Sequence, residues 1–141
     1  MADQIIHSTF ITVRYQETDQ MGVTHHSVYP VWFEAGRTDY IRARGEPYGK
    51  LEADGLFLPL IEMSCKFKGY SRYEDALEIR TRVQEATKSR LSFLYEVIRE
   101  DRLIAIGTTT HIYANRQLKP VNLGKYKPET LRLFQSFAGG Q

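Results

Sequence analysis

Residues 15–45, which open with the letters YQETDQMGVTHHSVYPVWFE, set the architecture of this chain. The first part is polar, and Gly22 within it tolerates a positive φ angle, so we predict a loop there. Ser27 is a candidate N-cap, and Pro30 suits a first helical turn, where a missing N–H costs little. A helix of about five turns should therefore run from Ser27 to a stop at Gly45. A carboxylate and a pair of histidines lie where the loop meets the helix, which indicates a catalytic loop.

The predicted helix carries one apolar stripe. Val28, Val31, Trp32 and Ala35 recur at i, i+3, i+4 and i+7, the spacing of a helix that packs one face against a core. We expect this stripe to contact the strands that follow.

Apolar and polar residues alternate elsewhere in the chain, which is typical of half-buried strands. We predict five of them, at residues 5–15, 58–68, 77–84, 91–99 and 102–114. The runs 91–99 and 102–114 are rich in apolar and threonine residues, so they are expected to be central strands covered on both sides. Pro128 is predicted to begin a short terminal helix.

The order strand, long helix, four strands predicts an α+β fold with an antiparallel meander. One long helix covers only one face of five strands. A second copy of the chain should therefore close the other face or an edge, and we predict a homodimer or a homotetramer.

Composition excludes several classes of protein. At 141 residues the chain is long enough for one domain, and we assign residues 1–141 to it. The net charge of +2 is too small to indicate a nucleic-acid partner. No apolar run approaches the ~18 residues of a membrane span, and the polar start is not a signal peptide. With Cys65 as its one cysteine, the chain has no internal disulfide, and a cytoplasmic location is expected.

The pattern YxxTDxxGxxxHxxY, which begins at Tyr15, is followed by FExxR from Phe33. Together with the order of elements, it resembles the hot-dog fold, a five-stranded antiparallel sheet wrapped around one long central helix. The likeness is greatest to the 4-hydroxybenzoyl-CoA thioesterase-like branch, which includes the acyl-CoA thioesterases associated with the Tol–Pal system. It spans roughly residues 10–134, and the segment YEDALEIRT from Tyr73 supports it.

The resemblance implies a role for individual residues. The family's catalytic aspartate falls on Asp19, and a tyrosine that some members use falls on Tyr15. The family's histidine at the helix start falls on His26, whose backbone N–H would polarise the thioester carbonyl. Basic residues before the fourth strand, here Lys88 and Arg90, would bind the CoA phosphates. The substrate-binding set is completed by Ser27, in the first turn, and Glu34, and no cofactor is expected.

This chain departs from the family at one point. Many relatives have a Pro-Ala-like pair where it has Tyr70-Ser71. The acyl pocket near that loop should therefore differ in shape.

The implied chemistry is hydrolysis of acyl-CoA to a carboxylic acid and CoA. Asp19 either attacks the thioester or activates water as a general base, and both routes use the same residue. The backbone N–H groups at residues 26–28 are unpaired at a helix N-terminus and suit the developing oxyanion. Each such donor is worth roughly 3 kcal/mol.

Each candidate also has a plain structural interpretation. Asp19 is equally suited to a turn that ends in glycine, and Tyr15 to the end of a strand with its ring in the core. His25 and His26 fit a polar helix start; adjacent histidines point apart in an extended segment, and no metal site is expected. Glu34 and Arg37 are spaced for a helical ion pair. Cys65 is better suited to the core than to nucleophilic attack.

Two other functions are consistent with the same residues. An acyl-carrier-protein thioesterase would act on carrier-bound acyl groups and little on CoA esters. A non-catalytic oligomeric module would bind acyl groups without releasing thiol. A hot-dog dehydratase is less favoured, because its motif is absent from the sequence.

Overall fold

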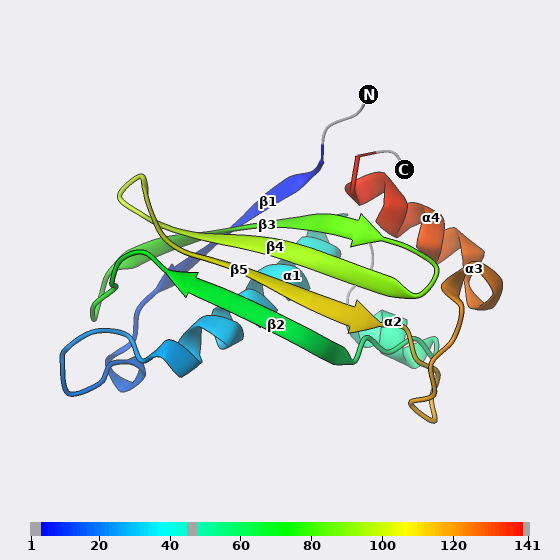
Figure 1. Cartoon of the computed structure of the whole chain (residues 1–141), viewed down its shortest axis with the longest axis horizontal. Helices are drawn as coiled ribbons and strands as arrows, with labels where there is room; N and C mark the ends of the chain where they lie inside the picture. The colour runs from blue at the N-terminus through cyan, green and yellow to red at the C-terminus, as the bar shows by residue number, and fades with distance from the viewer. Residues whose placement is uncertain (1–3, 45–47, 140–141) are drawn as a thin grey trace.

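The strands and helices of the computed structural model, which describes residues 4–44 and 48–139, follow the predicted order (Figure 1). The five strands are β1 (Ile6–Thr12), β2 (Leu60–Phe67), β3 (Ala76–Ala86), β4 (Arg90–Arg99) and β5 (Arg102–Ile112). The helices are α1 (Tyr29–Arg44), α2 (Tyr48–Ala53), α3 (Leu123–Tyr126) and α4 (Pro128–Phe137). The expected helix stop at Gly45 lies outside the described residues.

All five strands form one antiparallel sheet in the order β1-β3-β4-β5-β2. The predicted central strands are confirmed as interior strands, since β4 lies between β3 and β5, and β5 lies between β4 and β2. Their expected coverage on both faces is only partly observed. Figure 1 shows α1 behind the sheet, whereas Leu94 and Ile106 on the opposite face are only half-buried.

The face of α1 that packs on the sheet differs from the predicted stripe. Val31 is 55% exposed and Ala35 is exposed, so their assignment to the apolar face was wrong. The buried face instead follows the aromatic residues, which pack against the sheet. The buried residues of α1 are Tyr29, Trp32, Phe33, Gly36, Tyr40 and Ile41.

Gly36 allows α1 to approach the sheet closely. A Cβ atom at this position would lie 2.6 Å from Thr81 Oγ1 and 3.2 Å from Ile79 Cγ2, both on β3. Nearby, the rings of Phe33 and Tyr95 stack with their centroids 4.5 Å apart. Burying aromatic side chains of this size stabilises the fold by about 2–3 kcal/mol each, so this contact fixes where the start of α1 lies.

Strand β2 is an edge strand with unusual exposure. Met63, Cys65 and Phe67 pair with Thr109, Gly107 and Ala105 of β5, but the predicted alternation of buried and exposed residues is not observed, because every residue of β2 except the half-buried Cys65 is exposed. Met63 is 44% exposed and Phe67 49% exposed, because β2 has no neighbouring strand on its outer side among the described residues.

Candidate active site

The loop before α1 is a miniature hairpin closed at Asp19. The backbone N–H of Asp19 donates to Val23 O at 2.9 Å, and the N–H of Gly22 donates back to Asp19 O at 2.9 Å. The side chain of Asp19 also takes part, because Met21 N–H donates to its Oδ1 at 2.8 Å. Gly22 adopts a φ of 80°, the left-handed conformation for which glycine was predicted there.

The chain then passes into α1 through a single 3₁₀ turn, His26–Val28. The N-cap of this turn is His25, whose Nδ1 accepts from Ser27 N–H at 3.1 Å, so Ser27 is not the N-cap. Val28 N–H donates to His25 O, and Tyr29 N–H donates to His26 O. Of the 26–28 amides that we expected to be free, only that of His26 has no hydrogen-bond acceptor among the described residues.

The two histidine rings do not point apart as expected. Their centroids lie 4.2 Å apart with an interplanar angle of 30°, because the short turn replaces an extended segment. Among the described residues, no three His, Cys, Asp or Glu side chains are grouped so as to hold a metal ion.

A pocket of about 250 Å³ opens between this loop, the start of α1 and the end of β2. Asp19 and His26 both line it, so the structure brings the two principal candidates to one cavity. Its other lining residues are mainly apolar: Met21, Val23, Thr24, Tyr29, Phe67, Gly69 and Tyr70. An apolar cavity beside a carboxylate and a backbone donor suits an acyl group whose carbonyl carbon is attacked.

Tyr29 and Ser71 were not predicted as site residues, although Tyr29 belongs to the motif and Ser71 to the departure from it. Tyr29 Oη and Ser71 Oγ lie 3.1 Å apart, and Ser71 Oγ lies 2.6 Å from Thr24 Oγ1. Burial raises the pKa of Tyr29. The Ser71 side chain therefore links Tyr29 of the pocket to Thr24 in the loop before α1.

Other predicted site residues lie away from the pocket. Tyr15 is exposed and packs edge-on against Tyr73, with centroids 5.6 Å apart, so it neither enters the core nor lines the cavity. Ser27 is exposed beside His25. Glu34 lines two other hollows. Arg37, three residues further along α1, hydrogen-bonds to the buried side chain of Tyr95.

Lys88 and Arg90 lie at the far end of the sheet from the pocket. Arg90 pairs with Ile112 at the end of β5, whereas Phe67 of the pocket pairs with Ala105 near its beginning. Both basic side chains are exposed. Within one chain they are therefore not placed to contact a substrate at Asp19.

Cys65 is half-buried on the inner face of β2, and burial raises the pKa of its thiol. A thiol with a raised pKa is a poor nucleophile at neutral pH. The side chain is not part of the pocket lining.

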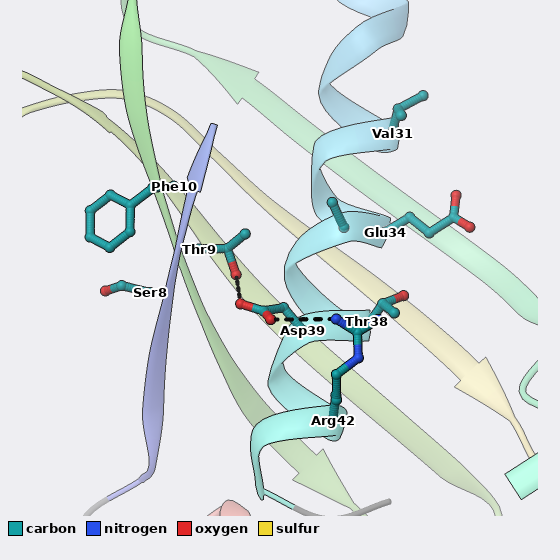
Figure 2. A pocket seen from close by; sticks show the side chains of 9 residues that line it. Ser8, Thr9, Phe10, Val31, Glu34, Thr38, Asp39 and Arg42 are labelled. Atoms are coloured by element: carbon teal, nitrogen blue, oxygen red, sulfur yellow. Dashed lines mark hydrogen bonds and ion pairs between the residues drawn. The ribbon is translucent and has the colours of Figure 1, made fainter. Parts of the chain in front are cut away.

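A larger hollow, of about 780 Å³, lies between β1 and α1 (Figure 2). It contains Asp39, whose Oδ2 accepts from Thr9 Oγ1 at 2.7 Å and lies 2.8 Å from His7 Nε2. A hydrolytic triad needs the histidine between the acid and the hydroxyl, but here the acid lies between the other two. This hollow therefore holds no activated nucleophile, and the smaller pocket is the candidate active site.

A five-stranded antiparallel sheet packed on one long helix is the fold of the hot-dog thioesterases. The family model described as the Thioesterase-like superfamily matches residues 13–130, and the chain belongs to this family. It is a thioester hydrolase. Among the described residues, no helix is both long and apolar enough to cross a membrane.

Individual relatives are similar over most of their length. The chain is 31% identical to a solved DHNA-CoA thioesterase from Staphylococcus aureus, with a TM-score of 0.88, covering 93% of this chain and 89% of that one. A Thermus thermophilus structure described as hypothetical protein TT1821 is 38% identical, with a TM-score of 0.86 and coverage of 94% and 98%. YneP of Bacillus subtilis, named as a candidate acyl-CoA thioesterase, is 30% identical over 84% of this chain and 88% of its own length.

Proposed function

We propose that the chain hydrolyses acyl-CoA thioesters to a carboxylic acid and CoA, with Asp19 and the His26 N–H as its reacting and polarising groups. The observation that carries the proposal is their common position at one apolar pocket. The names of YneP and of the Staphylococcus aureus enzyme support CoA esters as the substrates.

The Met21 bond supports different roles for the two oxygens of Asp19. Oδ1 accepts a hydrogen bond from Met21 N–H, which holds the carboxylate in one orientation. Oδ2 then attacks the thioester carbon and CoA thiolate leaves, after which water cleaves the resulting anhydride. In the alternative route Oδ2 removes a proton from water, the water oxygen attacks the same carbon, and the C–S bond breaks so that CoA leaves as the thiolate.

The oxyanion that forms in either route needs a preorganised donor. The His26 N–H lies at the start of α1, where the helix dipole is positive, and it is not used within the turn. One such donor contributes roughly 3 kcal/mol to the transition state. The His26 side chain, which lines the pocket, contributes to its rim.

We further propose that the active form is a homodimer formed through β2, and that two dimers build a homotetramer. The unpaired edge of β2 and its exposed apolar side chains support this, since such edges are normally paired or protected. Antiparallel pairing of two β2 strands would set residue 60 of one chain beside residue 67 of the other. Lys88 and Arg90 of one copy would then lie at the same end as the pocket of its partner, where they could bind the CoA phosphates.

We propose that residues 1–141 act as one hot-dog domain, located in the cytoplasm. The free, half-buried Cys65 is consistent with a reducing compartment.

The experiment that tests the function is thiol release from a panel of acyl-CoA esters and from acyl groups bound to a carrier protein. We expect turnover of CoA esters by the wild type. Activity on carrier-bound groups alone would favour a carrier-protein thioesterase, and binding without thiol release would favour an acyl-binding module. For the assembly, Met63→Lys should convert the oligomer to a monomer in sedimentation velocity, and a monomeric wild type would contradict the dimer.

A further inference from the structure

Glu17 is the only buried carboxylate among the described residues, and it lies two positions before Asp19. It is 7% exposed. It does not line the pocket, so the reaction proposed above leaves it without a role. A buried acid costs stability unless it is hydrogen-bonded, and its partners therefore indicate what it does.

The carboxylate of Glu17 joins the loop to α1. Its Oε1 accepts from the backbone N–H of Arg14 at 2.7 Å. Its Oε2 accepts from the indole N–H of Trp32 at 3.3 Å and from the Arg14 guanidinium at 3.3 Å. The Arg14 side chain is 64% exposed, so solvent screens that ion pair, whereas Trp32 is buried in α1.

The backbone of Glu17 holds the other side of the same loop. Its C=O accepts from His25 N–H at 2.9 Å, and its N–H donates to Arg14 O at 3.0 Å. Asp19 follows Glu17 by two residues, and His26 follows His25 directly. One residue therefore sets the position of both reacting groups relative to the helix.

We propose that Glu17 is a positioning residue for thioester hydrolysis: its carboxylate, bonded to Trp32, fixes the distance between the Asp19 carboxylate and the His26 N–H. This inference rests on the function proposed above. A misplacement of about 1 Å at a reacting group costs about 10²-fold in rate. Loss of the Glu17–Trp32 bond should therefore lower kcat by about 10²-fold, with a smaller change in KM, because Tyr29, Phe67 and Tyr70 of the pocket lie outside the loop.

Glu17→Gln is the first test, because the amide keeps the size of the side chain. The amide oxygen can accept from only one of the two donors, the N–H of Trp32 or the N–H of Arg14. The NH₂ group would then face the other donor. Trp32→Phe removes the indole N–H that donates to Glu17, and we expect it to lower kcat in the same way. Because both changes break one bond, the double variant should be no slower than the slower single variant. Arg14→Ala is the matched control: it removes only the screened guanidinium and should retain wild-type kcat.

Fluorescence supplies a readout that does not depend on activity. Trp32 is the only tryptophan of the chain, so the protein's tryptophan emission reports on the surroundings of this side chain. In Glu17→Gln we expect stronger quenching by acrylamide than in the wild type or in Arg14→Ala, since the loop no longer covers the indole.

The outcomes separate this inference from the proposed function. If Glu17→Gln and Trp32→Phe keep kcat within about twofold while Asp19→Asn is inactive, the positioning role is overturned and the function stands. Multiplicative losses in the double variant, or a loss confined to KM, would also overturn it. If Asp19→Asn keeps full activity, the proposed function fails. Should Glu17→Gln not fold, Trp32→Phe, whose replacement is also aromatic, carries the test.

Discussion

The backbone N–H of Met21 donates a hydrogen bond to Asp19 Oδ1 at 2.8 Å. Asp19 is therefore a turn residue, as its spacing from Gly22 allowed, and it also lines the candidate active-site pocket. The two interpretations of this residue do not exclude each other, because each uses a different carboxylate oxygen. They predict different effects for two substitutions.

Asp19→Asn should separate chemistry from structure. The asparagine oxygen still accepts from Met21 N–H, so the turn and the midpoint of thermal unfolding should stay close to those of the wild type. Thiol release should fall by about 10²–10⁴-fold, because an amide neither attacks the thioester nor accepts a proton. Asp19→Ala should lose both the activity and part of the stability. An Asp19→Asn variant with wild-type turnover would refute the proposed mechanism.

Gly22→Ala and Gly36→Ala should destabilise the protein for different reasons. Gly22 has a φ of 80° and open space around it, so an alanine there costs only backbone strain, about 1–2 kcal/mol. At Gly36 the added Cβ would lie 2.6 Å from Thr81 Oγ1, and α1 would have to move away from β3. Urea unfolding should show the larger loss for Gly36→Ala. Equal losses would mean that α1 does not approach the sheet as closely as described.

His111 should make stability depend on pH. Burial, aided by the positive charge of Arg37, lowers the pKa of His111 from 6.5 to about 4. Between pH 6.5 and 4 the unfolded chain therefore binds a proton that the folded chain does not. This contribution is complete above pH 6.5 and is lost as the pH falls to 4, by up to about 3 kcal/mol. His111→Gln should flatten the curve of unfolding free energy against pH in that window.

Lys88 and Arg90 should affect substrate binding only in the assembled protein. If one copy supplies them to the pocket of its partner, the double change to glutamine should raise KM for CoA esters severalfold and leave kcat unchanged. A truncated thioester that lacks the nucleotide should show the same KM with both proteins. Equal KM values for full CoA esters would reject the phosphate-binding role.

Much of the site follows from local rules that operate within a few residues. Gly22 needs a left-handed conformation, Asp19 accepts from an amide two residues ahead, and Pro30 suits a helix start. Alternation also predicted the strands, because period two is a property of any strand with one buried face. These features are visible in the letters of the chain because the interacting atoms are close in sequence.

Other features depend on contacts between distant segments. The buried face of α1 was misassigned because helical spacing alone admits either Val31 or the aromatic residues on that face, and only packing against the sheet selects between them. The bond from Glu17 to Trp32 spans 15 positions. Free energy here is gained by excluding water from surfaces that meet only in three dimensions, and no local pattern records which surfaces those are. The chain by itself determined the loop, the helix and the acid, and tertiary packing decided which face of α1 is buried and which residue of α1 holds the loop in place.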